Sequence, residues 1–491
     1  MNLKTILADT QIISVSRRGD PEISGIAYDS RKVQPDCLFF ALVGVAFDGH
    51  DFIEQAIAAG AVAVVCEHID HAEKYPEITF LKVKDSRLAL AHASHNFYLN
   101  PSRNIDMVAI TGTNGKTTTT FLIRNILQRL GKITGIIGTT GIFIDDEMLP
   151  ATHTTPESLE LAELLGKMCS HNVQNVAMEV SSHALCQHRA AEINFSAALF
   201  TNLTQDHLDY HKTMRDYAAA KKILFDNLDE SALAIVFNTS EYSEFMLSDC
   251  KAKHRYYIGY ENNADIVIDN IEIGYSATKF RMTFLHDLAK YGSHEFRTKL
   301  VGRFNVENAA LAVAYLVLSG YKIADVANIM QDVSGAPGRM DKVHLKNGAV
   351  AIVDYAHTPD ALEKALRTCR EILPQSGRLY SVFGCGGDRD TSKRPQMGKI
   401  STRLADFSII TDDNPRTEEP DAIIRNILQG IKPEDFQKFT VVEPRENAIE
   451  HAAKLAREGD IILVAGKGHE DYQIIGNTKH HFSDFEVLAG L

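Results

Sequence analysis

The stretch MVAITGTNGKTTTTFLIRNILQRLG, residues 107–131, has the pattern of an apolar strand, a glycine-containing turn and an amphipathic helix. Apolar side chains in its second half recur at the spacing of one helix face, at Phe121, Leu122, Ile126, Leu127 and Leu130. Further apolar runs (GIIGTTGIF, VAMEVSS, AALFTNL and LAIVFN) follow and alternate with helical stretches. This alternation predicts an α/β fold with a mostly parallel sheet and helices on both faces.

The turn in this stretch has the composition of a phosphate-binding loop. Backbone N–H groups from Gly112 to Lys116 can surround phosphate oxygens, and the N-terminus of the next helix favours their negative charge. Lys116 would reach the outer phosphates of a nucleotide, and the Thr117 hydroxyl would bind magnesium. The pattern is the shorter GxxGKT, because Ile110 stands where the longer pattern has a glycine. A glycine turn followed by an exposed lysine is the alternative, but the strand–turn–helix context favours a nucleotide site.

The chain of 491 residues is too long for one hydrophobic core. The polar stretch NPSRN at 100–104 is a plausible linker, and the Gly- and Pro-containing VSGAPGRMD at 333–341 marks a second boundary. We therefore expect three α/β domains, at 1–101, 102–336 and 337–491. The last has apolar runs of its own: VAIVDYA, RLYSVFG, FSIITDD, FTVVE and DIILVAG.

Composition narrows the functional classes. A net charge of −13 argues against a general nucleic-acid binder. No apolar run approaches the length of a membrane span, and MNLKTILADT is no secretion signal, so we expect a cytoplasmic protein without membrane insertion. As a separate expectation, we take the protein to be a monomer. The seven cysteines contain no CxxC pair, which excludes the common zinc spacings and a disulfide framework.

Polar residues near the ends of two further predicted strands indicate where the chemistry lies. Glu179 ends the apolar run of MEVSSH, and His207 follows the next run in TNLTQDHLDYH. Active sites of parallel sheets collect at such strand ends, so a carboxylate and an imidazole at neighbouring ends predict a magnesium site beside the phosphate loop. A hydrogen-bonded pair without metal is the alternative.

A lysine pair follows in YAAAKKILF. On a helix, Lys221 and Lys222 point about 100° apart, so only one can face the strand ends. Taken alone, the pair is more typical of a solvated helix face.

Nine motifs together resemble the Mur ligases, in which they occur in the same order: TGTNGKTT, MEVSSH, TNLTQDHLDYH, YAAAK, GRFNVENAALA, DYAHTPDAL, GCGGDRD, DNPR and GKGHE. The resemblance covers nearly the whole chain. These ATP-dependent ligases build the peptidoglycan stem peptide, and the closest resemblance is to the branch that extends UDP-N-acetylmuramoyl-L-Ala-D-Glu. The resemblance implies an N-terminal uridine-nucleotide domain, a central P-loop ATPase domain and a C-terminal Rossmann-like domain that binds the amino acid.

The resemblance also implies a mechanism and a set of site residues. The substrate carboxylate attacks the γ-phosphate of ATP, and an amine then displaces phosphate from the acyl phosphate. The implied metal ligands, for about two Mg²⁺ ions, are Thr117, Glu179, His207 and Lys221, the last as a carbamylated lysine (N6-carboxylysine), with Lys222 left as its solvated neighbour. The catalytic residues are Lys116, Lys221, Glu179 and His207. The ATP contacts are Gly112, Thr113, Asn114, Gly115, Lys116, Thr117, Thr118, Asn305, Arg339 and Asp354. The UDP-substrate contacts are Tyr28, Ser30, Val45, Ala46, Phe47, His153 (where an asparagine is expected), Thr154, Thr155, Ser181, Gln187 and Arg189. The amino-acid contacts are Arg389, Asp413, Asn414, Pro415, Arg416, Gly466 and Glu470.

Arg416, in the acid-rich loop TDDNPRTEEP, distinguishes between two possible amino acids. Lysine ends in an ammonium, whereas meso-diaminopimelate ends in an ammonium and a carboxylate. A guanidinium binds a carboxylate through two parallel hydrogen bonds and repels an ammonium, so Arg416 predicts diaminopimelate. The alternative is a loop arginine paired with Asp412 or Glu418.

Three other functions stay open at this point. The lysine-adding ligase of the same family is opposed by Arg416. A folylpolyglutamate synthetase-like ligase shares the loop and the ATPase fold, but would not need a UDP-binding domain or the DNPR and GKGHE motifs. A nucleotide-binding regulator would use the fold only as a switch, and the complete ligand set including Lys221 argues against it.

Overall fold

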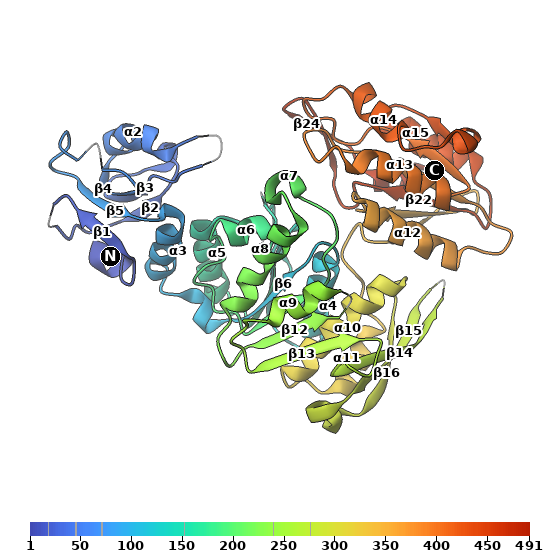
Figure 1. Cartoon of the computed structure of the whole chain (residues 1–491), viewed down its shortest axis with the longest axis horizontal. Helices are drawn as coiled ribbons and strands as arrows, with labels where there is room; N and C mark the ends of the chain where they lie inside the picture. Colours follow the sequence, from blue (N-terminus) through green and yellow to red (C-terminus); the bar gives the residue numbers. More distant parts are fainter. Residues whose placement is uncertain (18, 45–46, 70–71, 152, 239, 275) are drawn as a thin grey trace.

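Three β-sheets follow one another along the chain (Figure 1). The computed structural model describes residues 1–17, 19–44, 47–69, 72–151, 153–238, 240–274 and 276–491. The first sheet has the order β1-β5-β4-β3-β2 and is parallel apart from β1. Its strands are β1 (Ile12–Val15), β2 (Gly25–Ala27), β3 (Cys37–Phe40), β4 (Ala61–Cys66) and β5 (Thr79–Val83). Its helices are α1 (Leu3–Ile6), α2 (Ile53–Ala58) and α3 (Ser86–Phe97).

The central sheet has the order β16-β15-β14-β13-β12-β11-β6-β10-β7-β8-β9. Strands from β14 to β7 in this order are parallel, and antiparallel strands extend the sheet at both ends. The strands are β6 (Asp106–Thr111), β7 (Thr134–Gly138), β8 (Gly141–Ile144), β9 (Glu147–Leu149), β10 (Asn175–Glu179), β11 (Ala197–Phe200), β12 (Leu233–Phe237), β13 (His254–Gly259), β14 (Ile266–Ile273), β15 (Thr278–Phe284) and β16 (Ser293–Thr298). The helices are α4 (Lys116–Arg129), α5 (Ser158–Ser170), α6 (Ser182–Cys186), α7 (Leu208–His211), α8 (Met214–Asp226), α9 (Glu241–Leu247), α10 (Arg303–Leu318) and α11 (Ile323–Met330). The prediction of a mostly parallel central sheet is confirmed.

Two hydrophobic clusters hold helices against the two faces of the central sheet. Val108 and Ile110 of β6 belong to one cluster, and Met107 and Ala109 belong to the other, because successive strand residues point to opposite faces. Helix α10 is buried along nearly its whole length, including all of residues 309–317. Each fully buried Leu or Val contributes about 1.5–3 kcal/mol of stability relative to an exposed one. The burial of α10 therefore stabilises the central unit.

The third sheet has the order β17-β18-β22-β19-β20-β21 and is parallel apart from β17. Its strands are β17 (Asp341–His344), β18 (Val350–Asp354), β19 (Leu379–Phe383), β20 (Phe407–Ile410), β21 (Phe439–Val441) and β22 (Ile461–Ala465), and a separate hairpin consists of β23 (Tyr472–Ile475) and β24 (Thr478–His481). Its helices are α12 (Pro359–Ile372), α13 (Lys393–Leu404), α14 (Pro420–Leu428), α15 (Arg445–Leu455) and α16 (Asp484–Gly490). These parallel strands with helices on both faces match the expected Rossmann-like arrangement.

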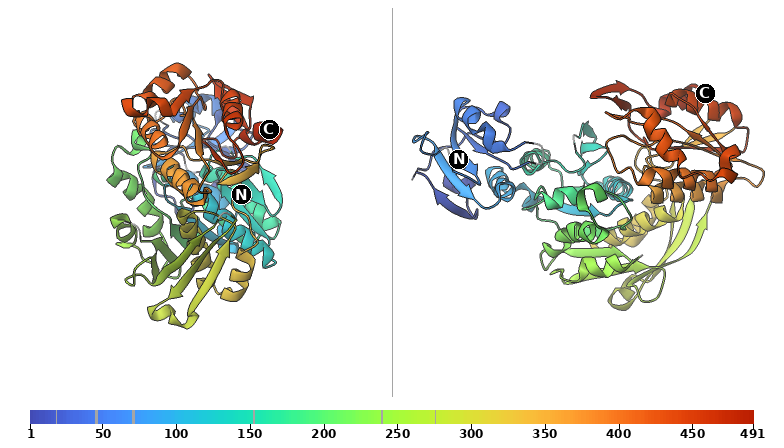
Figure 2. Two further views of the ribbon diagram at one scale, coloured as in Figure 1. Left: turned by 90° about the vertical axis from the view of Figure 1, so that its right-hand side faces the viewer. Right: turned by 45° about the horizontal axis from the view of Figure 1, so that its top comes forward.

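The first and third units lie at opposite ends of the central unit (Figures 1 and 2). The N-terminal unit contacts the centre through α3, which packs on α5, and through an ion pair of Arg87 with Glu157 at 3.3 Å. The expected boundaries fall in the 3₁₀ turn Pro101–Asn104 and between α11 and β17, and they stay predictions. Within the described ranges, no helix has the length and apolar character that a membrane span requires.

Candidate active site

The phosphate loop joins β6 to α4, and glycines hold it in conformations that other residues rarely adopt. Gly112 has φ +144° and Gly115, which caps α4, has φ +92°. A Cβ at Gly115 would lie 2.2 Å from Asn308 Oδ1, so a larger residue would disturb both the loop and α10. Thr113 donates its backbone N–H to Asn202 O at 2.9 Å, which ties the loop to the segment after β11. The sequence prediction of strand, glycine turn and helix is thus confirmed.

Two lysine side chains converge on this loop. Lys116 Nζ donates to Gly112 O and Thr113 O, both at 2.9 Å. Lys221 Nζ reaches the same Gly112 O at 2.9 Å from α8, and its side chain is only 1% exposed. Burial and the Lys116 charge lower the pKa of Lys221 well below its usual value, so a neutral amine is favoured there.

Lys222 does not have the solvated position predicted for it. Its side chain is buried, and its ammonium pairs with Asp226 one turn along α8 and with Asp249 at 2.8 Å. The prediction that the two lysines point in different directions is correct, because only Lys221 contacts the loop. The prediction that Lys222 is solvated was wrong, because Asp226 on the same helix and the more distant Asp249 both pair with its ammonium.

The Glu179 carboxylate at the end of β10 lies beside the phosphate loop. Its Oε2 accepts hydrogen bonds from Thr117 Oγ1 and Thr139 Oγ1, both at 3.1 Å, and its Oε1 accepts from Thr139 N at 3.0 Å. Two of the predicted metal ligands, Thr117 and Glu179, are therefore adjacent.

His207 lies in the loop after β11, at the start of α7. The prediction that Glu179 and His207 follow neighbouring strands is wrong, because β6 lies between β10 and β11. Their loops flank the phosphate loop on its two sides instead. His207 Nε2 lies 3.4 Å from Asp206 Oδ2, and its ring packs edge-on against the His183 ring at 4.9 Å between centroids. The His207 side chain is 45% exposed, but the protein atoms around its ring lower its pKa to about 4, which favours the neutral ring with a free nitrogen lone pair.

The residues present suit a magnesium ion bound together with phosphate oxygens. No three His, Cys, Asp or Glu side chains gather as a metal site among the residues that the structure describes. Mg²⁺ does not need such a cage, because it commonly uses one or two protein oxygens, waters and substrate phosphates. The Thr117 hydroxyl and the Glu179 carboxylate supply oxygen donors of this kind next to the loop.

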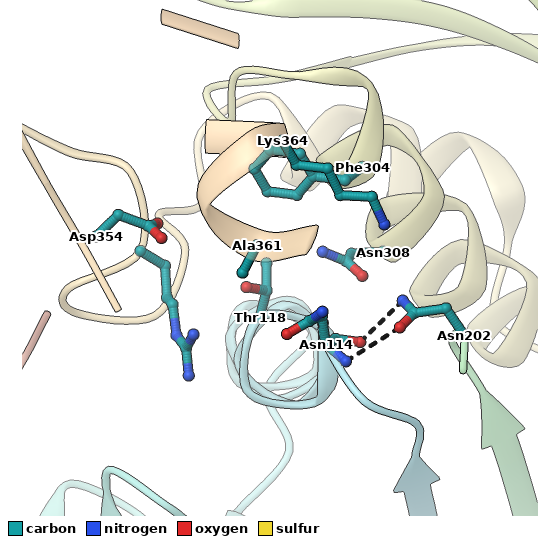
Figure 3. Close-up of a pocket in the computed structure, with 10 residues that line it drawn as sticks. Asn114, Thr118, Asn202, Phe304, Asn308, Asp354, Ala361 and Lys364 are labelled. Carbon is teal, nitrogen blue, oxygen red and sulfur yellow. Dashed lines mark hydrogen bonds between the residues drawn. The ribbon is translucent and has the colours of Figure 1, made fainter. Parts of the chain in front are cut away.

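A small pocket lies where the phosphate loop meets α10 and α12 (Figure 3). Its lining comprises Asn114, Gly115, Thr118, Asn202, Phe304, Asn308, Arg339, Asp354, Ala361 and Lys364. In Figure 3, Ala361 of α12 stands over Thr118 of α4, with Asn308 to one side. The pocket measures about 50 Å³, whereas ligand pockets usually measure about 300–1,000 Å³. A space of this size does not hold a nucleotide, so we expect the C-terminal unit, which contributes α12, to move outward when one binds.

Asn305, the predicted adenine contact, does not line this pocket. Its Nδ2 donates to Val301 O at 2.9 Å, and its Oδ1 accepts from Asn308 Nδ2 at 3.2 Å. Asn308 is the amide that lines the pocket, and Asn305 positions it. The motif NVEN contains both residues, so Asn308 was available in the sequence but was not singled out.

Two predicted nucleotide contacts reach the loop from the C-terminal unit. Arg339 Nη2 donates to Thr117 Oγ1 at 3.3 Å, and its guanidinium lies 4.5 Å from the centre of the Tyr355 ring. Asp354 at the end of β18 lines the same pocket, and its Oδ2 accepts from Met340 N at 2.8 Å. Both residues therefore lie beside the phosphate loop, and their contacts with a nucleotide stay a prediction.

The predicted UDP-substrate residues of the central unit form one connected group. Thr155 Oγ1 donates to Glu179 O at 2.9 Å and accepts from Ser181 N at 3.1 Å. Arg189 joins the group by donating to Thr155 O at 3.0 Å and to Gln187 Oε1 at 3.0 Å.

Thr154 extends this group toward the metal ligands, because its hydroxyl lies 3.1 Å from Thr139 Oγ1. His153, next to it, is exposed. The arrangement links the predicted substrate positions to the strand end that carries Glu179.

The predicted UDP-substrate residues of the N-terminal unit lie apart from this group. Tyr28 Oη donates to Glu160 Oε1 of α5 at 2.6 Å, so Tyr28 touches the central unit. Ser30 is buried, and Phe47 is 77% exposed. The remaining two positions, Val45 and Ala46, lie outside the described residues.

A second pocket, of about 310 Å³, lies between the central and C-terminal units. The central unit contributes Thr154, Asp206, His207 and Asp209. The C-terminal unit contributes Tyr355, His357, Gly384, Cys385, Gly386, Arg389, Asp390, Lys393, Asp413, Asn414, Arg416, Gly466 and Glu470. Every predicted amino-acid contact except Pro415 is in this lining. Pro415 is buried behind it, with its carbonyl against Gly387.

Lys467 organises the base of this pocket and was missed in the sequence. It is fully buried, and its Nζ lies 3.0 Å from Asn414 Oδ1, 3.3 Å from Asp413 Oδ1 and 3.6 Å from Glu470 Oε2. Three of the predicted contacts therefore share one cation. Its place in GKGHE, between two glycines, was the available signal.

Arg416 enters the pocket from a strained loop position. Its φ is +53°, and its backbone N–H donates to Ile474 O of the hairpin at 3.1 Å. Its Nη1 donates to Gly387 O at 2.7 Å. Burial, followed by the Arg389 charge, lowers the pKa of Arg416.

The alternative of a structural ion pair for Arg416 does not hold. Asp412 accepts a hydrogen bond from Gln473 at 2.5 Å, and Glu418 pairs with Arg394 at 2.8 Å. None of the described carboxylates forms an ion pair with Arg416. The half-buried guanidinium keeps hydrogen-bonding capacity directed into the pocket.

Three family matches cover most of the chain. The Mur ligase middle domain matches residues 110–316, the Mur ligase glutamate ligase domain matches 338–468, and the Mur ligase family catalytic domain matches 22–98. The chain is 42% identical, over 100% of its own length and 99% of the relative's, to a UDP-N-acetylmuramoyl-L-alanyl-D-glutamate–2,6-diaminopimelate ligase of Clostridium botulinum. The chain belongs to the Mur ligase family.

Two further likenesses extend over the full length of this Mur ligase. A Geobacillus kaustophilus protein of the same description is 42% identical, over 99% of this chain and 98% of the relative. A solved structure of a UDP-N-acetylmuramoyl-L-alanyl-D-glutamate–2,6-diaminopimelate ligase superposes with a TM-score of 0.71 at 30% identity, covering 100% of this chain and 98% of the other.

Proposed function

We propose that this Mur ligase joins meso-2,6-diaminopimelate to UDP-N-acetylmuramoyl-L-Ala-D-Glu in peptidoglycan synthesis, with ATP as co-substrate. The observation that carries the choice of amino acid is Arg416, whose guanidinium lines the pocket without a carboxylate partner in the described part of the chain. Full-length relatives at 42% identity bear the name of this ligase, which supports the same substrates. We place the reaction in the cytoplasm and expect a monomer.

The chain's own residues divide the reaction between two pockets. Lys116 and the backbone of the phosphate loop bind the phosphates of ATP and direct the terminal one toward the substrate carboxylate. Attack by that carboxylate forms the acyl phosphate. Asn414, Glu470 and Arg416 hold the distal end of the amino acid, so that its other amine meets the acyl carbon. Attack by this amine forms the amide and releases phosphate.

Magnesium supplies positive charge that offsets the phosphate oxygens during transfer. Thr117 and Glu179 would hold it at the loop, with a neutral His207 on the other side of β6. We propose Lys221 as the carbamylated ligand. A neutral buried amine is the form that reacts with CO₂, and the lowered pKa of Lys221 favours that form.

The lysine-adding ligase is the second candidate, and Arg416 opposes it. A lysine substrate would bring an ammonium to a guanidinium and leave that guanidinium unpaired in the pocket. The folylpolyglutamate synthetase-like alternative is disfavoured because the Mur ligase catalytic-domain match includes N-terminal residues 22–98. A regulator without turnover would not need the connected amino-acid pocket.

The test is phosphate release by the purified protein with ATP, Mg²⁺ and UDP-N-acetylmuramoyl-L-Ala-D-Glu. Turnover is compared between meso-diaminopimelate and L-lysine, with mass spectrometry of the product. We expect turnover with diaminopimelate and little with lysine. A preference for lysine would keep the family and overturn the substrate, and no turnover with either would overturn the proposed ligase reaction.

A further inference from the structure

Lys393 is a buried lysine whose ammonium pairs with none of the residues that the structure describes. It opens α13, is 9% exposed, and lines the pocket between the central and C-terminal units. The described residues give its ammonium neither a hydrogen bond nor an ion pair. A lysine whose stem is buried and whose ammonium lines a pocket without a described partner is suited to bind an anion that arrives with the ligand.

The residues next to Lys393 are already engaged, which isolates its charge. Arg394 pairs with Glu418 at 2.8 Å and donates to Gly386 O at 3.2 Å, so it fixes the start of α13. Asp390 accepts two hydrogen bonds from Ser392, at 2.6 and 2.9 Å. The neighbouring groups therefore hold the helix start in place and leave Lys393 to the pocket.

The charge of Lys393 reaches the central side of the pocket. Burial, followed by the Lys393 charge, lowers the pKa of His357 to about 4. Lys393 lines this pocket together with Asp206 and His207, which follow β11, the strand next to β6 and its phosphate loop. Lys393 thus faces the phosphate-transfer side from the C-terminal unit.

A comparison of the anionic groups in the proposed reaction with the cations that line the pocket indicates which anion Lys393 binds. Diaminopimelate brings two carboxylates, and the pocket offers two guanidiniums, Arg389 at its exposed edge and Arg416 deeper in. The acyl phosphate brings a third anion. Among the described residues of the C-terminal unit, Lys393 is the third cation that lines the pocket. His357 is not counted because its lowered pKa favours the neutral ring. Lys467 is not counted because its ammonium already pairs with Asp413 and Glu470.

We propose that Lys393 is a catalytic residue of the second chemical step, in which the amino-acid amine attacks the acyl phosphate. Its ammonium binds the phosphoryl group while the amine displaces phosphate. This proposal rests on the proposed function. In that step the amine nitrogen bonds to the acyl carbon, and the bond from that carbon to the phosphate oxygen breaks. The electron pair leaves on phosphate, and the amine proton ends there as HPO₄²⁻. The negative charge that grows on the departing phosphate is the charge that Lys393 offsets.

The experiment separates the two steps in Lys393→Met, with Lys399→Met as a control on the exposed side of the same helix. Rapid quenching without amino acid measures ADP formed with the acyl phosphate. Steady-state turnover then gives kcat and KM for whichever amino acid supports wild-type turnover, so the proposed function is judged by the wild type alone. We expect the ADP burst to persist in Lys393→Met, KM to change by less than about threefold, and kcat to fall by about 100- to 1,000-fold, as for loss of one preorganised charge stabiliser.

Other outcomes would overturn the assignment in distinct ways. A raised KM with unchanged kcat would place the amino acid's carboxylate on Lys393, and loss of the ADP burst would place Lys393 in the first step. An unchanged ADP burst, kcat and KM in Lys393→Met would show that the Lys393 ammonium takes no part in the reaction. If methionine prevents folding, the same two readouts on Lys393→Gln and Lys393→Arg decide the point, with the arginine variant expected to exceed the glutamine variant in kcat.

Discussion

Replacing Arg416 by alanine should remove the preference for diaminopimelate over lysine. The Arg416 guanidinium is half-buried and donates one hydrogen bond from Nη1 to Gly387 O at 2.7 Å. Its other N–H donors remain available for the ligand. Removing one partner of a buried, hydrogen-bonded charge pair costs about 2–5 kcal/mol, and partial exposure places this site near 2–3 kcal/mol. The expected loss in kcat/KM for diaminopimelate is therefore about 30- to 150-fold.

The same substitution should leave lysine turnover unchanged or raise it, because it removes the repulsion between two cations. The assay measures phosphate release across concentrations of each amino acid, for wild type, Arg416→Ala and the exposed control Arg425→Ala on α14. An equal fall for both amino acids would refute the reasoning, since it would mean that Arg416 maintains the loop through Gly387 rather than reading the carboxylate.

Three further outcomes follow from groups in the interior. Lys221→Gln should abolish turnover, and intact mass of the gently handled wild type under bicarbonate should show an added CO₂ that is missing in the variant. Gly115→Ala should weaken ATP binding by at least tenfold in calorimetry, because φ +92° and the 2.2 Å approach to Asn308 both oppose a side chain. Among the described residues, the two ring nitrogens of the buried His95 have no hydrogen-bond partner, and burial lowers its pKa to about 4. Below pH 6.5 the unfolded chain therefore binds more protons than the folded one, and stability falls as pH drops from 6.5 toward 4. His95→Gln should shrink the loss of unfolding free energy between pH 7 and pH 5 by up to about 2 kcal/mol in urea titrations, whereas the exposed His344→Gln should not.

The phosphate loop was predictable because its determinants are local. A strand, two glycines and a helix start lie within residues 107–131, and each follows from short-range conformational preference. The α/β character of the C-terminal unit was predictable for the same reason, since its buried strands are uninterrupted apolar runs, whereas its Rossmann-like arrangement was implied by the family resemblance.

The errors concern residues whose environment depends on distant parts of the chain. Lys222 is covered because Asp249 comes from the segment after α9, which a helical projection of α8 does not reveal. Glu179 and His207 follow consecutive parallel runs in the chain, but β6 inserts between their strands. Strand order depends on crossover connections, which local spacing does not determine.

Asn308 and Lys467 lay inside quoted motifs, and their importance depends on packing rather than on residue type. Asn308 reaches the nucleotide pocket because Asn305, one helical turn earlier, holds its amide. Lys467 matters because three other site residues turn toward it. Neither relation can be deduced from a motif without the fold.

The narrow space between α4 and α12 has a kinetic consequence. The space that Ala361 of α12 and Thr118 of α4 line is too small for a nucleotide, and the loops that line the proposed amino-acid pocket belong to the same unit as α12. Binding should therefore be ordered, with the nucleotide first and the amino acid last, after the C-terminal unit has swung back. We expect ADP to stay bound until that unit moves away again. This would shield the acyl phosphate from water, and product release would then limit the turnover rate.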